Sequence, residues 1–423
     1  MSHLTLFWKI RHAALYVCTV SSKITMDDPF DSYPEIEEIK EELLNNGPAA
    51  AAEKAQEHLK KLNNIPLNIG ITGESGSGKS TFVNAFRGID NRDERAAPTG
   101  SVETTLEVIP YHHPNYPNVT LWDLPGIGTT NFPAYKYLEH VEFEKFDFFI
   151  IISDTRFREN DVKLAQEIQK MRKKFYFVRS KIDHNLRDEE RSQREFNAER
   201  TLAQIRENCI QGLQKQGVDA PQVFLVSSFD LHLYDFHLLE ETLERELPAH
   251  KRNALLLAMP NVNLEIINKK KEALQAKIKY LACMSALIAS APVPGLSVAI
   301  DLTCLVNAVI EYQVTFGLDS GSLQKLALSA RVPVDDLKAV MKSPLAGKEI
   351  TKELIIKLLS LSVSGAALMA AEEGSRFIPI FGIPAAMALS FASTYNSLNT
   401  FLNMLADDAQ RVFKKALGLN TSV

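Results

Sequence analysis

The 423-residue sequence contains only four cysteines, and no two of them are close together. They lie far apart along the chain, at Cys18, Cys209, Cys283 and Cys304. This spacing argues against a disulfide framework and against a zinc site built from paired cysteines. The cysteine content therefore fits a reducing, intracellular setting.

An excess of positive charge is also missing. The formal net charge is -5, so the chain lacks the basic field that nucleic-acid binding requires, and we expect no nucleic-acid partner. Hydrophobic residues make up 45% and charged residues 23% of the chain, which is typical of a globular protein. At this length we expect two or three domains.

Acidic residues are absent from the first 25 positions, which carry several basic groups before Asp27. That composition resembles a targeting segment. Against this interpretation, Lys9 and Arg11 interrupt the apolar runs, and no small-residue cleavage pattern follows. We therefore predict that residues 1–26 are a poorly ordered extension, with a targeting segment as the alternative.

The remainder of the chain shows two kinds of pattern. Residues 33–62 have helical spacing, divided at Gly47 and Pro48. Short apolar segments then alternate with charged helical ones; these strand-like segments are IPLNIGIT, VTLWD, FDFFIIIS, KFYFVRS and QVFLVSS. Strands separated by helices predict a mostly parallel sheet covered on both faces. After Pro248 only helical segments, interrupted by prolines, remain.

Four regions follow from these patterns. Residues 1–26 form the extension, residues 27–63 the N-terminal helices, residues 64–247 an α/β domain and residues 248–423 a C-terminal helical domain. We expect the N-terminal and C-terminal helical segments to pack together into one all-α domain.

The stretch GITGESGSGKST, residues 70–81, matches the phosphate-binding loop pattern without a mismatch. It follows a predicted strand (residues 67–72) and precedes a predicted helix (residues 81–86). Glycines in such a loop let backbone N–H groups approach phosphate oxygens, and the helix N-terminus adds its dipole. Lys79 can reach the β- and γ-phosphates, and Ser80 can ligate Mg²⁺. The predicted nucleotide-binding residues here are Gly73, Glu74, Ser75, Gly76, Ser77, Gly78, Lys79, Ser80 and Thr81.

A second phosphate-side motif follows in LWDLPGIG. Asp123 ends a predicted strand, where its carboxylate can hold Mg²⁺ through water, and Gly126 can offer a bare N–H to the γ-phosphate. Asp-x-x-Gly is common by itself, but here it lies 44 residues after Lys79 within an α/β pattern. Together the two motifs predict a nucleoside triphosphate site with Mg²⁺.

The base is predicted to be read by RSKID, at the end of a strand. Asp183 can accept hydrogen bonds from N1–H and N2–H₂ of guanine, an edge that adenine does not offer, while the stem of Lys181 lies along the ring. Ser180 stands where Asn or Thr is usual in GTPases, which weakens the expectation of loop bracing. In LVSS, Ser227 and Ser228 are predicted to offer backbone N–H to the guanine O6.

Between these motifs, APTGSVETTLEV contains candidate switch residues. Either Thr104 or Thr105 can close over Mg²⁺ and the γ-phosphate, and two ordinary strand threonines are the alternative. The pair His112 and His113 is predicted to be solvated loop residues. Ile127 stands where small GTPases carry a water-orienting glutamine, which predicts slow intrinsic turnover.

The motifs GESGSGKSTFVNAFRGI, TGSVETT, VTLWDLPGIGTTNFP and KKFYFVRSKID, with LYDFHLLEETLERELPAHKR, resemble the immunity-related GTPases of the interferon-inducible, dynamin-like group. The similarity extends from about residue 27 to the C-terminal helices and is closest to the subgroup with Gly-Lys-Ser in the phosphate loop. It implies a P-loop GTPase domain, Mg²⁺ and self-assembly in the GTP state. It also implies that Thr105 is the switch threonine and that Glu103 contacts a second nucleotide-bound molecule. Ser180 departs mildly from the family's usual threonine.

Two segments, residues 281–300 and 377–406, contain no charged residue and are long enough to span a bilayer. Prolines interrupt both, and the second is rich in Ser, Thr and Asn. We expect core helices of an α-bundle; a membrane-surface or hairpin insertion device and a true span are the alternatives. The family resemblance implies peripheral association with intracellular membranes.

The sequence therefore predicts a cytoplasmic, membrane-associating GTPase that binds GTP and GDP and assembles as a homodimer or larger oligomer, or with related GTPases. Lys79, Glu103, Thr105 and Gly126 are its predicted catalytic residues, and Ser80, Thr105 and Asp123 its predicted metal ligands. One alternative is a GTP-controlled scaffold with negligible turnover. Another is a regulator of membrane traffic without an immune role.

Overall fold

The computed structural model describes residues 38–39, 41–42, 45–100, 107–125, 142–154, 159–218, 221–289, 296–361 and 382–418. The predictions for residues 1–26, and those for Glu103, Thr104, Thr105, Gly126 and Ile127, lie outside the described residues. The chain divides into two compact units. One comprises Ile65–Ile266, and the other comprises Met1–Asn64 together with Ile267–Val423.

The first unit is built on a six-stranded sheet with the order β2-β3-β1-β4-β5-β6. Its strands are β1 (Leu67–Thr72), β2 (Ile109–His112), β3 (Val119–Asp123), β4 (Phe148–Ser153), β5 (Lys174–Arg179) and β6 (Val223–Leu225). All neighbouring strands pair in parallel except β2 and β3, which are antiparallel. The prediction of a mostly parallel sheet is confirmed, and the five predicted strands correspond to all of these except β2.

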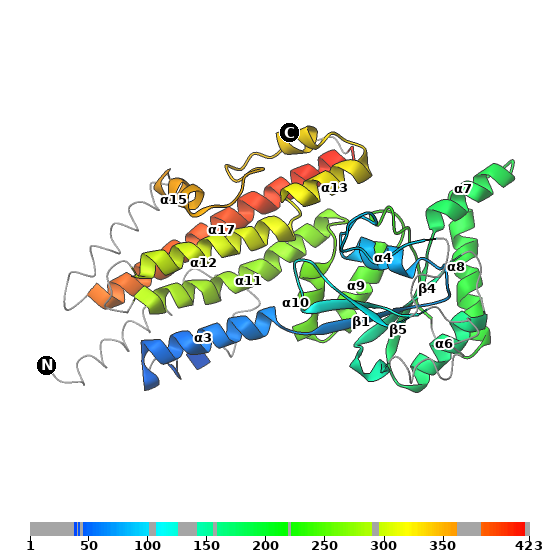
Figure 1. Ribbon diagram of the computed structural model, residues 1–423, viewed down its shortest axis with the longest axis horizontal. Helices are drawn as coiled ribbons and strands as arrows, with labels where there is room; N and C mark the ends of the chain where they lie inside the picture. Colours follow the sequence, from blue (N-terminus) through cyan, green and yellow to red (C-terminus); the bar gives the residue numbers. More distant parts are fainter. Residues whose placement is uncertain are drawn as a thin grey trace. The chain divides into compact units, whose positions relative to one another are not determined.

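Helices cover the sheet (Figure 1). Apolar side chains on the two faces of the strands belong to two separate cores. In β4, Phe148, Ile150 and Ile152 belong to one core, whereas Phe149 and Ile151 belong to the other, because successive side chains point to opposite faces. The first core is completed by α4 (Lys79–Phe86), α9 (Phe236–Glu246) and α10 (Ala249–Ala258). The second is completed by α6 (Glu159–Lys170), α7 (Ile182–Ser192) and α8 (Ala198–Lys215).

Helix α10 packs in the core of the sheet unit. Leu255 and Ala258 are about 1% exposed within the same core as the strands. Its N-terminal turn is also bound to the sheet, because Lys251 pairs with Asp147, whose carboxylate accepts from the backbone N–H of Asn68 at 2.9 Å. The sheet unit therefore extends to Ile266, whereas the sequence pattern placed the domain boundary at residues 247/248.

The prediction that His112 and His113 are solvated loop residues is wrong. His112 lies in β2, the strand that the sequence analysis did not predict, although its side chain is exposed. His113 is buried, and its Nδ1 accepts hydrogen bonds from the backbone N–H groups of Asn115 and Tyr116 at 3.3 and 3.2 Å. Two adjacent histidines before a proline gave no sign that one ring stabilises the turn of a hairpin.

The other unit is helical throughout its described residues. Its longer helices are α3 (Pro48–Asn63), α11 (Leu264–Ala289, which begins in the sheet unit), α12 (Leu296–Thr315) and α17 (Gly382–Ala416), and its shorter ones are α13 (Ser320–Ala330), α14 (Val334–Ala339) and α15 (Lys352–Leu361). Gly47, at φ +91°, precedes α3, and Pro48 occupies its first turn. A proline is tolerated there because its missing N–H would have no helical partner.

Helices α11 and α17 run antiparallel. Ser285 contacts Ser390 near one end of the pair, and Gln410 donates to Asn268 at 2.8 Å near the other. Helix α3 packs against both, with Ala51 and Ala55 buried together with residues of α11 and α17. The N-terminal and C-terminal helical segments therefore share one core, as the sequence predicted.

The described parts of the two charge-free segments lie in α11, α12 and α17. Ala282, Ala286 and Phe391 are buried in the core that α3 completes. Ser285, Ser390 and Thr394 are buried too, and their hydroxyl groups bond to one another at 2.6 and 2.8 Å. Among the helices of the described residues, none combines the length and apolar character needed to cross a membrane.

Candidate functional site

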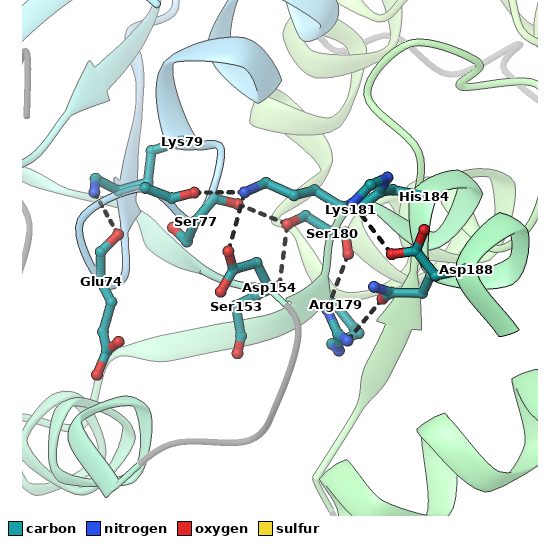
Figure 2. Close-up of polar contacts among 12 residues, drawn as sticks. Glu74, Ser77, Lys79, Ser153, Asp154, Arg179, Ser180, Lys181, His184 and Asp188 are labelled. Carbon is teal, nitrogen blue, oxygen red and sulfur yellow. Dashed lines mark hydrogen bonds and ion pairs between the residues drawn. The ribbon is translucent and has the colours of Figure 1, made fainter. Parts of the chain in front are cut away.

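The predicted nucleotide residues gather at the carboxyl ends of the parallel strands (Figure 2). The phosphate loop follows β1, and the RSKID loop follows β5; β4 lies between these two strands. In the sheet register, Ile151 is opposite Thr72 of β1, and Ser153 is opposite Arg179 of β5. The carboxyl ends of parallel strands are the usual place for ligand sites in such sheets.

Three glycines give the phosphate loop its path. Gly73, Gly76 and Gly78 have φ values of +140°, +78° and +97°, which L side chains rarely adopt. At Gly73 an added Cβ would also lie 2.1 Å from the carbonyl oxygen of Ile152. The loop therefore requires glycine at Gly73 for both backbone conformation and space. Of its other predicted residues, Ser75 is exposed, Ser77 is buried, and Thr81 lies half-buried in α4.

Lys79 begins α4 and lies under the loop, with 7% of its surface exposed. Its Nζ donates to the carbonyl oxygens of Gly73 and Glu74 at 3.2 and 3.0 Å. The ammonium group is thus held among loop carbonyls close to where phosphate oxygens are expected. A buried ammonium there supplies the positive charge that a phosphate requires.

Ser80 and Asp123 lie together, although 43 residues separate them. The Ser80 hydroxyl donates to Oδ2 of Asp123 at 2.5 Å, and the Asp123 carboxylate is fully buried. Both groups offer oxygen ligands of the kind that Mg²⁺ prefers. These donors fit a magnesium ion bound together with nucleotide phosphates.

Ser180 joins the base loop to the phosphate loop. Its Oγ lies 2.6 Å from the carbonyl oxygen of Ser77 and 3.1 Å from that of Ser153, and its N–H donates to the latter at 2.8 Å. The serine hydroxyl thus contacts the phosphate loop directly, although the sequence gave less reason to expect bracing from serine than from Asn or Thr.

Lys181 extends from the base loop over the phosphate loop (Figure 2). Its backbone is left-handed, with φ 56° and ψ 32°. Its Nζ donates to the carbonyl oxygen of Gly76 at 2.6 Å and to Oδ2 of Asp154 at 3.0 Å. A Cβ at Gly78 would lie 3.7 Å from Lys181 Cε, so the lysine stem passes over that glycine.

Asp183 lies in the first turn of α7, and 17% of its side chain is exposed. Its Oδ2 accepts from Arg187 at 2.7 Å, and the Arg187 Nε–H donates to its backbone carbonyl at 3.2 Å. Burial, followed by the charges of Asp183 and Asp230, raises the pKa of Tyr234. The carboxylate predicted to read guanine is therefore held by a neighbouring arginine and lies near a tyrosine.

The loop after β6 adjoins the base loop through the backbone. Val226 donates to the carbonyl of Arg179 at 2.9 Å, and its own carbonyl accepts from Ile182 at 3.4 Å. Ser227 is fully buried, and its hydroxyl has no hydrogen-bond partner within the described part of the chain. Ser228, directly after it, is half-buried. The structure thus brings the LVSS segment next to the RSKID segment.

Sequence reasoning missed the residues that follow β4. Asp154 pairs with Lys181, and Ser153 donates to Oδ2 of Asp161 at 2.7 Å. Asn160, on α6, donates to the side chain of Glu74 at 2.9 Å. The available signal was the polar SD pair after the apolar run FDFFIII, because a central strand ends between its neighbours' loops.

The comparisons with known proteins agree with this geometry. The profile of the family described as "Interferon-inducible GTPase (IIGP)" matches residues 32–416. Interferon-inducible GTPase 5 of Bos taurus is 43% identical over 385 residues, which cover 90% of this chain and 82% of that protein. Interferon-gamma-inducible GTPase 10 of Mus musculus is 39% identical over 368 residues, covering 86% of this chain and 85% of that protein.

A third relative, Interferon-inducible GTPase 1 of Mus musculus, is 42% identical over 303 residues, covering 71% of this chain and 73% of that protein. The family profile extends across both the sheet unit and the helical unit. The chain is therefore a GTPase that belongs to the interferon-inducible GTPase family.

Proposed function

We propose that Mg²⁺·GTP binds between the phosphate loop and the RSKID loop, and that its hydrolysis to GDP is coupled to self-association of the chain. The observation that carries this proposal is the contact of the two loops: Ser180 reaches Ser77, and Lys181 reaches Gly76. A triphosphate on one loop and a base on the other are thereby assigned to a single site.

On the phosphate side, each group has a separate task. Backbone N–H groups of the glycine-rich loop and the N-terminus of α4 surround phosphate oxygens. Lys79 exchanges its two carbonyl partners for the β- and γ-phosphates and neutralises their charge. The ammonium is already at the loop, so nucleotide binding requires only a short movement of its tip.

Ser80 and Asp123 would hold the magnesium ion, with Thr105 as the proposed switch ligand. When bound, Mg²⁺ neutralises charge that develops on the phosphate oxygens. The hydrogen bond between Ser80 and Asp123 keeps both oxygens at one place before the metal arrives. Gly126 is proposed to offer its N–H to the γ-phosphate.

On the base side, Asp183 is proposed to accept from guanine N1–H and N2–H₂, with Ser227 and Ser228 presenting backbone N–H to O6. Adenine presents no matching donors to the carboxylate, so it would form fewer hydrogen bonds at this site than guanine. Arg187 donates to Oδ2 of Asp183 at 2.7 Å and holds the carboxylate in place in the first turn of α7.

Turnover is proposed to depend on a second molecule. Ile127 cannot form a hydrogen bond to the attacking water, so the monomer lacks the usual water-positioning side chain. Glu103, in the switch segment, is the proposed group that a facing GTP-bound molecule presses into place. Dimers or larger oligomers would therefore hydrolyse GTP faster than monomers.

The cellular role is proposed from the relatives. Their names link them to interferon, which supports a role in interferon-linked defence within the cell. We propose that the chain acts in the cytoplasm at the surface of intracellular membranes, alone or assembled with related GTPases. The helical unit is the proposed membrane-binding part.

Nucleotide selectivity of the full chain tests the proposal. The full chain is titrated with GTP and with ATP, each in Mg²⁺ and again in EDTA. Of the two nucleotides, only GTP should bind tightly. Hydrolysis of GTP should stop in EDTA. Equal affinity for ATP and GTP would contradict the base assignment, whereas turnover that persists in EDTA would contradict the role of Ser80 and Asp123.

A further inference from the structure

The end of β4 lies between the two loops of the nucleotide site. Because β4 pairs with β1 on one side and with β5 on the other, its last residues meet both the phosphate loop and the base loop. Asp154 directly follows Ser153, the last residue of β4. Its Oδ2 accepts from Lys181 at 3.0 Å, and only 13% of its side chain is exposed.

The backbone of Lys181 is fixed without Asp154. Ser180 before it is bonded to Ser77 and Ser153. After it, the carbonyl of Lys181 accepts from the N–H groups of His184 and Asn185 at 3.1 and 3.0 Å. The remaining freedom belongs to the long side chain, whose tip contacts Gly76 and Asp154.

A lysine side chain gains several rotamers when its tip is released, and binding that requires one of them becomes weaker. Because 38% of the Lys181 side chain is exposed, water competes with its protein partners for the ammonium group. The carboxylate at the end of β4 holds the ammonium on the phosphate loop, so that the stem already passes over Gly78 before nucleotide binds.

We infer that Asp154 is a positioning residue of the nucleotide site, which acts through Lys181 to fix the surface on which the guanine ring lies. This inference rests on the proposed function, because it assumes that Lys181 contacts the base. It assigns a role to a carboxylate whose charge, considered by itself, repels a triphosphate. If Asp154 positions Lys181, removing it should weaken GTP binding. If its charge only repels the triphosphate, removing it should strengthen GTP binding.

The test is GTP affinity of the full chain, measured by calorimetry, for Asp154→Ala, Lys181→Met and the double variant. Asp154→Ala should weaken GTP about two- to fivefold, as expected for a partly exposed ion pair. In the Lys181→Met background the same substitution should have no further effect, because the group through which it acts is gone. Asp154→Asn, which keeps an acceptor but loses the charge, should fall between wild type and Asp154→Ala.

Steady-state kinetics adds a second readout. Asp154→Ala should raise KM and leave kcat unchanged, since Lys181 contacts the base side and not the reacting phosphate. The matched control is Asp188→Ala, which removes an exposed carboxylate that pairs with His184 on α7 at 3.3 Å. This control should match wild type in both affinity and KM.

Tighter or unchanged GTP binding by Asp154→Ala and Asp154→Asn would overturn the inference, as would an equal loss in the Lys181→Met background. If Lys181→Met itself binds GTP as wild type does, the base-site assignment in the proposed function fails. Failure of the positioning role and failure of the proposed site are thus distinguishable.

Discussion

Lys79 is the residue on which the proposed phosphate binding depends most. It is buried, and its ammonium group already lies among loop carbonyls, so Lys79→Ala removes a buried positive charge from the phosphate loop. We expect GTP affinity to fall by about 2–5 kcal/mol, roughly 30-fold to several thousand-fold. Calorimetry measures the affinity, and circular dichroism of the same sample checks the fold. A folded variant with unchanged affinity would remove the phosphate-loop assignment.

Asp183 carries the prediction of base selectivity. In Asp183→Asn one acceptor becomes a donor, so guanine loses a hydrogen bond while the xanthine O2 gains one. GTP should bind roughly 30-fold or more weakly, and xanthosine triphosphate should bind more tightly than to wild type. Competition between the two nucleotides measures the switch. A variant that still prefers GTP would show that another group reads the base.

At the residue scale, motif spacing predicted the candidate nucleotide residues but not the residues that support them. Ser80 lies against Asp123, and Lys181 contacts the phosphate loop at Gly76. The contact between Lys181 and Asp154 was not predictable, because it depends on which strands are neighbours in the sheet. A motif records spacing along the chain, whereas this contact joins residues on different strands.

Among the elements, the phosphate loop offers a comparison of two glycines. Gly73 and Gly76 both have positive φ, but an added Cβ meets the Ile152 carbonyl at Gly73 and open space at Gly76. Without nucleotide, Gly76→Ala should cost about 1–2 kcal/mol of folding free energy, the usual cost of a left-handed conformation. Gly73→Ala should cost about 4 kcal/mol or more, because the backbone must move.

Thermal unfolding of the two nucleotide-free variants measures this difference. A lower midpoint for Gly73→Ala than for Gly76→Ala is expected. Equal midpoints would mean that the loop path is not held against β4.

The elements also show where the pattern of apolar residues was informative. Five strands were predicted from short apolar segments, because strands buried on both faces are rich in apolar residues. Strand β2, with the sequence IPYH, contains a proline and alternates between half-buried and exposed positions at the sheet edge. Such a short edge strand carries too little apolar sequence to be distinguished from a loop.

For the whole molecule, we propose that the sheet unit binds nucleotide and the helical unit binds membranes. The sheet unit Ile65–Ile266 contains its own buried core, and the helical unit requires both α3 and the C-terminal helices. If the helical unit carries membrane attachment, the full chain should float with liposomes, whereas residues 65–266 alone should remain unbound. Flotation of the shorter fragment would move the attachment site to the sheet unit.

At this scale the sequence indicated two kinds of structure but not their border. The sequence of α10 has the same helical pattern as the segments that follow it, yet this helix packs against the sheet. Periodicity reports which face of a helix is apolar and not which core buries that face. The domain boundary therefore depends on tertiary contacts.

The central claim is that self-association accelerates hydrolysis of GTP, and specific activity as a function of protein concentration tests it most directly. With light scattering followed in the same samples, activity per molecule should rise over the concentrations at which GTP-dependent assemblies form. Glu103→Ala should flatten that rise while GTP affinity stays unchanged. Specific activity that does not depend on concentration while assemblies form, or a Glu103→Ala protein with the wild-type rise, would contradict the account.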